Sequence, residues 1–295
     1  MTTLWNYTKR GLRIVMGRVP AGRSLSMFPD DVFLISYPRS GNTWMRFLLG
    51  NLIYPEDPIT FANIESRVPE VYLFADRVLR QLPRPRILKS HEYFDPRYRK
   101  MIYIVRDPRD VLVSMYHYHI KRRNFPDGYP MAEFASLFVA GSQRLGFWGS
   151  WGQHVKSWLD THDSGNDFLV LHYEDMLQDP RRELARIAKL LNIEPAAETL
   201  NRAVELSSAE RMRSLEKQES QEWIGTKQTR QDKPFVRSAT SGSWREIPDH
   251  SCLSQIEAAW APLMRKLGYA PMSGSSRESI LPEPAGKIIN ESRVN

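Results

Sequence analysis

Three continuous apolar runs constrain this 295-residue chain most strongly, because a helical pattern follows each of them. The runs are DVFLISY at 31–37, MIYIVR at 101–106 and FLVLHYE at 168–174. They lack the strict alternation of half-exposed strands, and such runs are typical of parallel strands buried on both faces. The repeated order of strand and helix predicts an α/β fold, a single domain with a central parallel β-sheet flanked by helices.

Asp-Pro pairs mark the predicted starts of two of these helices. Asp107 can cap a helix, and Pro108 suits its first position, where a backbone N–H would have no partner. Asp179 and Pro180 repeat this start after the third run. Between these two helix starts, the segment GSWGQHVKSWLD places His154 on an apolar helix face. We therefore expect this histidine to pack in the core and not to bind a ligand.

We place the domain at 31–271, between a basic leader at 1–30 and a tail at 272–295 that we expect to be disordered. Within the domain, the polar stretch 214–246 is punctuated by glycine and proline and indicates a lid loop. The last helical pattern, LSQIEAAWAPLMRKLGY, contains Pro262, which we expect to kink or divide the helix.

Charge and cysteine content narrow the class of function. Lys and Arg number 41 against 34 Asp and Glu, and the net charge of +7 favours an anionic partner. Cys252 is the only cysteine, which excludes an intrachain disulfide and a cysteine zinc site and favours the cytoplasm. We expect no membrane span, because no run reaches about 18 consecutive apolar residues.

The first apolar run leads directly into SYPRSGNTW, a turn suited to hold an anion. Gly41 permits a positive φ or a close approach of a ligand, and the first amides of the following helix point into the turn. Arg39 adds positive charge, and Ser40, Asn42 and Thr43 add side-chain donors. The turn lacks the lysine and second glycine of a Walker A loop, so no motif predicts a nucleoside triphosphate with magnesium.

A second anion site is predicted where the next run ends. Arg106 ends that strand, and Ser114 lies on the helix face that turns toward the same point. Ligands of open α/β sheets bind at the carboxyl ends of the strands. Two anion sites at two strand ends indicate a nucleotide that carries phosphates in two places.

Five segments between about 33 and 245 resemble the cytosolic-type sulfotransferases, which use 3′-phosphoadenosine 5′-phosphosulfate (PAPS). YPRSGNTW is similar to the family's phosphosulfate loop YPKSGTTW, and YIVRDPRDVLVSMYHY to its 3′-phosphate strand and helix. LHYEDMLQDPRREL resembles the YEDM-x-x-DP segment, GSWGQHVKSW the segment before it, and RSATSGSW the late RKGxxGDW loop. The resemblance implies the P-loop-NTPase-like sulfotransferase fold, with PAPS as co-substrate and no metal.

The resemblance also implies roles for individual residues. His91, in a segment similar to the family's KTH motif, would be the general base for the acceptor hydroxyl. Arg39 and Lys89 would meet the negative charge that develops during transfer, and Trp44 would stack on adenine. The residues implied to bind the cofactor are Arg39, Ser40, Gly41, Asn42, Thr43, Trp44, Arg106, Ser114, Tyr173, Ser207 and Arg237.

The chain departs from the family pattern at four places. Arg39 replaces the loop lysine, and Ser238 and Ala239 replace the Lys-Gly of the late loop, which removes one cation from the 3′-phosphate site. Ala209 stands where the family often has a second aromatic partner for adenine. No KxxxTVxxxE dimerisation pattern is found near the C-terminus, so the oligomeric state stays open.

The implied reaction is in-line transfer of a sulfuryl group from PAPS to a small-molecule acceptor, an alcohol or phenol, with an amine as a further option. Six aromatic residues either line the acceptor pocket or belong to the core: Phe61, Tyr72, Phe74, Tyr93, Phe94 and Tyr116. Two alternatives stay open, a nucleotide kinase or NTPase with a divergent phosphate loop, and a non-catalytic nucleotide- or nucleic-acid-binding protein. No nucleic-acid motif accompanies the basic runs, so nucleic acid is not the expected partner.

Overall fold

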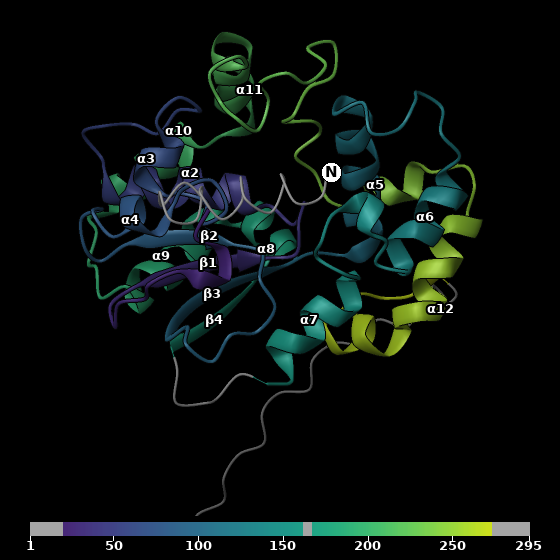
Figure 1. Ribbon diagram of the computed structural model, residues 1–295, viewed down its shortest axis with the longest axis horizontal. Coiled ribbons are helices and arrows are strands. Elements are labelled where there is room, and N and C mark those ends of the chain that lie inside the picture. The colour runs from purple at the N-terminus through teal and green to yellow at the C-terminus, as the bar shows by residue number, and fades with distance from the viewer. Residues whose placement is uncertain (1–19, 162–166, 273–295) are drawn as a thin grey trace, which may run out of the picture.

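The computed structural model describes residues 20–161 and 167–272, which form a single α/β domain around a four-stranded parallel sheet (Figure 1). The strand order across the sheet is β2-β1-β3-β4. The strands are β1 Val32–Ser36, β2 Ile87–Ser90, β3 Lys100–Val105 and β4 Asp167–His172. The single domain and its parallel sheet confirm the predicted fold class, while the first nineteen residues of the predicted leader and the tail from residue 273 lie outside the described residues.

The helices follow the strands as the sequence pattern predicts. They are α2 Asn42–Ile53, α3 Ile64–Arg67, α4 Asp76–Leu79, α5 Pro108–Lys121, α6 Met131–Val139, α7 Trp151–Leu159, α8 Tyr173–Gln178, α9 Pro180–Leu190, α10 Ala197–Leu206, α11 Ala209–Glu219 and α12 Ser251–Lys266. Short 3₁₀ turns lie at Gly22–Ser24, Gln143–Leu145 and Ser243–Glu246. Helix α11 extends six residues into the polar stretch that we expected to be a loop, and α12 runs through Pro262 without being divided.

The two Asp-Pro helix starts are confirmed. The Asp107 side chain accepts a hydrogen bond from the Arg109 N–H at the start of α5, and Asp179 accepts one from the Arg182 N–H at the start of α9. The proline that follows each aspartate occupies the first turn, where its missing N–H costs no helical hydrogen bond.

Two strand predictions were incomplete. Strand β2 was not predicted, because its four residues, ILKS, are too short a run to show a periodicity. The third apolar run ends as a strand at His172, and Tyr173 begins helix α8 instead of continuing β4. Tyr173 is therefore turned toward the carboxyl end of the sheet by a helix start.

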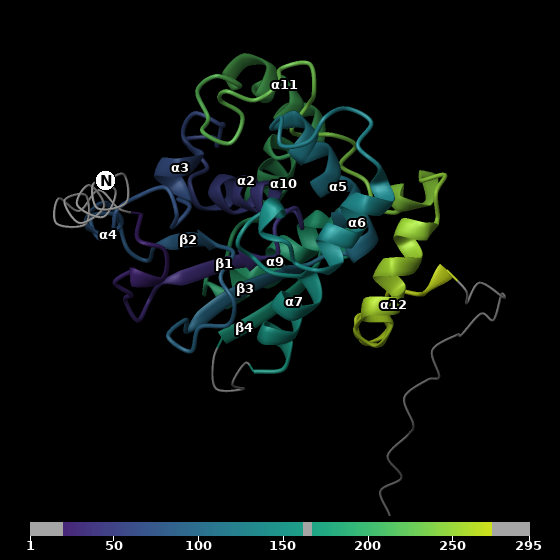
Figure 2. The same cartoon turned by 45° about the vertical axis from the view of Figure 1, so that its right-hand side comes forward.

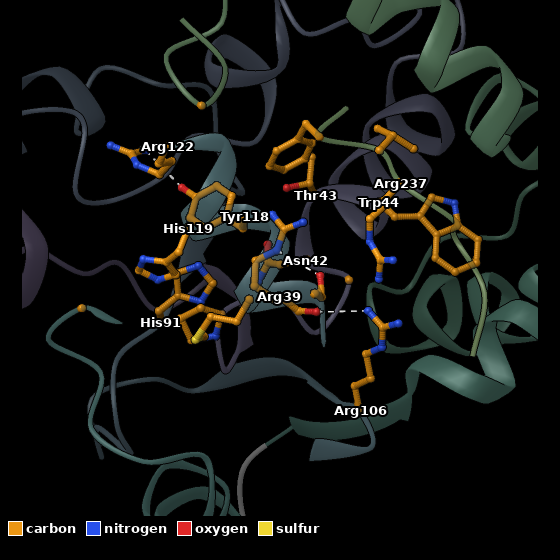
Figure 3. A pocket seen from close by; sticks show the side chains of 18 of the residues that line it. Arg39, Asn42, Thr43, Trp44, His91, Arg106, Tyr118, His119, Arg122 and Arg237 are labelled. Atoms are coloured by element: carbon orange, nitrogen blue, oxygen red, sulfur yellow. Dashed lines mark hydrogen bonds between the residues drawn. The ribbon is translucent and has the colours of Figure 1, made fainter. Parts of the chain in front are cut away.

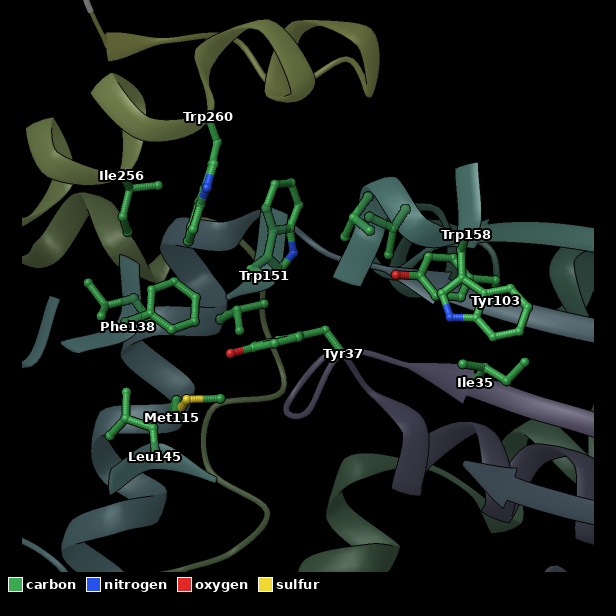
Figure 4. Close-up of a cluster of buried hydrophobic side chains, with 14 of the residues drawn as sticks. Ile35, Tyr37, Tyr103, Met115, Phe138, Leu145, Trp151, Trp158, Ile256 and Trp260 are labelled. Carbon is green, nitrogen blue, oxygen red and sulfur yellow. The ribbon is translucent and has the colours of Figure 1, made fainter. Parts of the chain in front are cut away.

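Hydrophobic layers cover both faces of the sheet. On one face, Phe33 and Ile35 of β1 pack with side chains of α5, α6, α7 and α12 (Figure 2). Figure 4 shows this layer where Tyr37, Trp151 and Phe138 converge beside α12. On the other face, the alternate β1 residues Val32 and Leu34 pack with α2, α9 and α10. The alternation of side chains along a strand explains how one run serves both layers.

His154 lies in the first of these layers, as its helix pattern predicted. Its ring is fully buried in α7, and the ring lies 5.6 Å from the ring of Tyr37 and 5.9 Å from that of Tyr103. Both layers leave the carboxyl ends of the four strands uncovered, and the residues that follow those ends form the site described next.

Candidate active site

A cavity of about 610 Å³ opens at the carboxyl ends of all four strands (Figure 3). Each strand is followed by a residue that lines it: Arg39 after β1, His91 after β2, Arg106 after β3 and Tyr173 after β4. Nine of the eleven predicted cofactor residues and both further catalytic candidates line this one cavity. The two exceptions are Ser40 and Ser207.

The turn after β1 has the backbone that its sequence predicted. Gly41 adopts φ +100°, and a Cβ added there would lie only 2.5 Å from Cδ2 of Tyr173. Arg39 itself lies in the left-handed region at φ 70°. Glycine is thus required at position 41 both for its conformation and for the close approach of the Tyr173 ring.

Two buried donors of the site have no hydrogen-bond partner among the described residues, the Ser40 hydroxyl and Nε of Arg106. Such orphaned groups are rare in folded proteins, because a buried polar atom without a partner costs free energy. An oxyanion placed at the turn would accept from donors of this kind, so the residues present fit a phosphate-like group. Of these two donors, Arg106 is part of the cavity wall and Ser40 is not.

The Arg39 guanidinium is held between two aromatic rings. Its Cζ lies 4.6 Å from the ring centroid of Tyr118 and 4.6 Å from that of Phe235, and its Nε donates to the Ser114 hydroxyl at 3.2 Å. Burial lowers the pKa of Arg39 to about 10, which still leaves it charged at neutral pH. The sequence showed no signal for this arrangement, because Phe235 belongs to the distant polar stretch.

Arg106 and Arg237 bring two further guanidinium groups to the other end of the cavity (Figure 3). Arg106 donates to the Arg39 carbonyl at 3.3 Å and to the Thr240 carbonyl at 3.0 Å, and its Cζ lies 4.1 Å from the Tyr173 ring centroid. Burial, and then the nearby Arg106 charge, lower the pKa of Arg237. In the described part of the chain neither arginine pairs with a carboxylate, so a bound dianion would relieve their repulsion.

Trp44 lines the cavity close to this arginine pair. Its indole N–H donates to the Ser207 carbonyl at 3.0 Å, and its ring meets that of Tyr173 edge to face at 5.8 Å. Ser207 was predicted to face the nucleotide, but its buried hydroxyl donates to the Ala203 carbonyl instead. The backbone of Ser207 thus positions Trp44, while Ala209 lines the wall where an aromatic partner is missing.

His91 has a defined tautomer. Its Nδ1 lies 2.7 Å from the Ser36 carbonyl, and because a carbonyl can only accept, Nδ1 carries the proton and Nε2 is left as the basic atom. Burial, followed by the Lys89 charge, holds the pKa of His91 well below its usual range. The ring is therefore neutral and ready to accept a proton at physiological pH.

A set of hydrogen bonds that no sequence motif predicted fixes the backbone of His91. The Tyr72 hydroxyl accepts from the His91 N–H at 3.1 Å, and the His154 ring donates from Nε2 to the His91 carbonyl at 3.1 Å. The Tyr103 hydroxyl, at 3.0 Å from Nδ1 of His154, supplies the proton that fixes this tautomer. The core histidine thus positions the candidate base.

Lys89 pairs with a carboxylate that sequence reasoning missed. Its Nζ lies 2.5 Å from Oε2 of Glu70, which also lines the cavity. Burial raises the pKa of Glu70, but the attraction of Lys89 outweighs burial and leaves it below its ordinary value. Glu70 follows a short helix in a segment without a recognisable motif, so neither periodicity nor spacing singles it out.

The six aromatic residues considered for the acceptor pocket do not line the cavity. Phe61 is buried against Phe47 and Trp223, and Tyr72 supports His91 from behind. The structure thus favours the core alternative for these residues. The aromatic side chains that do line the cavity are Trp44, Tyr118, Trp148, Tyr173, Trp223 and Phe235.

The late loop that contributes Arg237 is attached to α5. Asp110 accepts hydrogen bonds from the Gly242 N–H at 2.6 Å, the Ser243 hydroxyl at 2.9 Å and the Trp244 N–H at 3.1 Å. Ala239 adopts φ 53°, the left-handed conformation that suits the glycine of the family pattern better than alanine.

Within residues 20–161 and 167–272, no helix is both long and apolar enough to cross a bilayer. Across the same residues no group of three or more His, Cys, Asp or Glu side chains is arranged to hold a metal ion.

Comparisons with known proteins agree on one family. Residues 29–268 match the family model described as the sulfotransferase domain. The chain is 30% identical to sulfotransferase 1A1 of Bos taurus over 82% of this chain and 85% of that protein, and 29% identical to sulfotransferase 1E1 of Rattus norvegicus over 75% and 79%. Among solved structures, it resembles mouse sulfotransferase SULT7A1 complexed with PAP, with a TM-score of 0.65, 24% identity, and coverage of 82% of this chain and 87% of that one.

Proposed function

The chain belongs to the sulfotransferase domain family, and from this premise we propose that it transfers the sulfuryl group of PAPS to an acceptor hydroxyl, with His91 as general base. One observation is the main support: the anion-binding turn, the Arg106–Arg237 pair and the Nε2 of His91 open into the same cavity. Family membership supports the sulfotransferase activity itself, and the cavity supports the donor and the base.

The residues present fit a nucleotide that bears anionic groups at two places. The turn at Gly41, with the amides of α2 and the Arg39 side chain, would hold the 5′-phosphosulfate end. Arg106 and Arg237, with Ser114, would hold the 3′-phosphate, and Trp44 offers a ring face for the adenine. The mouse relative in complex with PAP supports this choice of nucleotide.

When bound, PAPS supplies the electrophilic sulfuryl group, and the protein supplies a base and positive charge. His91 accepts the acceptor's hydroxyl proton at Nε2, because Nδ1 is already committed to the Ser36 carbonyl. Arg39 and Lys89 provide cations where negative charge develops. Because burial keeps the ring neutral, the base is available without prior deprotonation.

The donor site is tested by calorimetric titration with 3′,5′-adenosine diphosphate, the desulfated product, and in parallel with ATP and magnesium. We expect tight binding of the bisphosphate, a loss of at least tenfold in Arg106→Ala, and no comparable binding of ATP. Arg123→Ala is the matched control, since Arg123 is exposed and lies outside the cavity wall. Equal binding of ATP and turnover with magnesium would favour the nucleotide kinase instead.

The base is tested by replacing His91 with alanine. We expect transfer to a phenol to fall at least about 100-fold, while the affinity for the bisphosphate changes little. His250→Ala, at an exposed histidine before α12, serves as control. Unchanged turnover in His91→Ala would remove this residue from the mechanism.

A further inference from the structure

The cavity extends beyond the proposed reaction centre to a second group of cations. Arg122 and Arg144 line its wall, together with Gln143, His119 and Asn124. In Figure 3, Arg122 and His119 lie on the same side of Arg39 as His91, whereas Arg106, Arg237 and Trp44 lie on the other. This second group is therefore on the acceptor side of the cavity and apart from the proposed nucleotide site.

Aromatic neighbours of His119 hold the two arginines, because Arg122 packs on the Tyr118 ring and Arg144 on the Phe125 ring. The Asn124 amide donates to Nδ1 of the His119 ring at 3.0 Å. Arg144 places its Cζ 4.9 Å from the ring centroid of Phe125, which meets the His119 ring at 5.8 Å. Burial, with a smaller contribution from the Arg122 charge, lowers the pKa of His119 to about 4, so His119 is a neutral member of the cluster.

Neither arginine is neutralised by the protein. Across residues 20–161 and 167–272, no ion pair joins Arg122 or Arg144 to a carboxylate. The described cavity wall holds six Lys or Arg side chains and one carboxylate, Glu70, which Lys89 already occupies. Such a surplus favours an anion and disfavours an ammonium group.

Apolar side chains connect His91 to this cluster. The Trp148 ring lies 5.4 Å from the His91 ring, and Leu145 and Met115 line the wall between the two ends. Arg144 and Trp148 are four positions apart in the sequence, so their Cα atoms lie at most about 14 Å apart. An aryl-alkyl or two-ring molecule fits within this limit.

We propose that the acceptor carries an anionic group in addition to its hydroxyl, and that Arg122 and Arg144 bind that group. The inference rests on the proposed function and names its substrate class: a hydroxyl-bearing carboxylate, or another oxyacid, with an apolar body between the two groups. Arginine suits this role because its planar N–H donors match a carboxylate. Tyr118 borders both ends, because its hydroxyl accepts from Nη1 of Arg122 at 3.1 Å while its ring packs on Arg39.

The test compares two acceptors that differ only in charge, 4′-hydroxybiphenyl-4-carboxylate and its carboxamide, in PAPS-dependent sulfation. We expect kcat/KM for the acid to exceed that for the amide by about tenfold in the wild type. The double variant Arg122→Gln, Arg144→Gln should lose this preference and retain its turnover of the amide. Arg123→Gln, one residue away and outside the cavity wall, should keep it.

Equal kcat/KM for the two acceptors in the wild type would overturn the inference and leave the proposed function intact. A preference for the acid that survives in the double variant would overturn it as well. If no sulfuryl transfer occurs to either compound, the proposed function fails. Calorimetric binding of the same two compounds to the protein saturated with 3′,5′-adenosine diphosphate then decides the inference. Tighter binding of the acid that is lost in the double variant supports the inference, and equal binding of the two compounds overturns it.

Discussion

Replacing Tyr118 by leucine should lower kcat more than it lowers the affinity for the bisphosphate, because the turn amides, Arg106 and Arg237 would still hold the phosphates. The Arg39 guanidinium lies between the Tyr118 and Phe235 rings, each 4.6 Å from its Cζ, in a half-buried position on the cavity wall. A desolvated cation–π contact contributes about 2 kcal/mol, which corresponds to ~30-fold in a population ratio. Without one ring the guanidinium visits orientations that do not face the reacting atoms, so kcat should fall by roughly 10- to 30-fold.

The assay is steady-state sulfation at saturating PAPS and acceptor, with bisphosphate affinity measured by calorimetry on the same samples. Phe235→Leu should behave like Tyr118→Leu, because the two rings face Arg39 at the same distance. Tyr118→Phe keeps the ring and should retain kcat within about threefold. Equal losses in Tyr118→Phe and Tyr118→Leu would refute the reasoning, since the hydroxyl and not the ring would then matter.

Three further predictions address the base, the turn and the fold. Burial and the Lys89 charge hold the pKa of His91 well below 6.5, so its basic form persists as the pH falls. We therefore expect kcat/KM to stay flat from about pH 8 to 6.5. A profile that declines with a midpoint near 6.5 would contradict this. Gly41→Ala should abolish tight bisphosphate binding and lower Tm more than Gly128→Ala does. Gly128 has φ +75° and no atom within 4 Å of the added Cβ, so equal losses of Tm in the two variants would show backbone strain alone. Asp31→Asn leaves the fully buried Arg86 without its charge partner and should cost about 3–5 kcal/mol in urea unfolding; a loss under about 1 kcal/mol would contradict that estimate.

The sequence predicted the parts of the fold that local physics determines. Continuous apolar runs need burial on both faces, and the Asp-Pro starts satisfy helix N–H groups within three residues, so both signals are local. Strand β2 could not be predicted this way, because it is short and depends on pairing with β1 through Val32 and Ile87. The same limit explains β4, where Tyr173 continues an apolar run in sequence but begins a helix in space.

For the site, the sequence predicted the residues that follow strand ends but not their supporting contacts. His91 and Arg106 follow their strands directly and Arg39 lies three residues after β1, so their positions derive from the sheet topology. Ser207, which the resemblance placed near the adenine, is not part of the cavity wall, and its hydroxyl donates to the Ala203 carbonyl, a bond that a motif cannot reveal. Glu70 was missed because its place beside Lys89 depends on a loop that pairs alongside β2 in a parallel bridge.

Buried charges outside the cavity explain how an arginine can stand in the loop position of a lysine. Lys121, at the end of α5, donates to the carbonyls of residues 230 and 233 and pairs with Glu216 at 3.5 Å. Glu216 accepts from the Phe235 N–H at 2.6 Å, which fixes the polar stretch against the helix that bears Tyr118. Both rings around Arg39 are thereby placed by one polar network, and a guanidinium, broader than an ammonium, gains a defined orientation from them. The replacement and the two rings therefore form one unit, although the three residues lie far apart in the sequence.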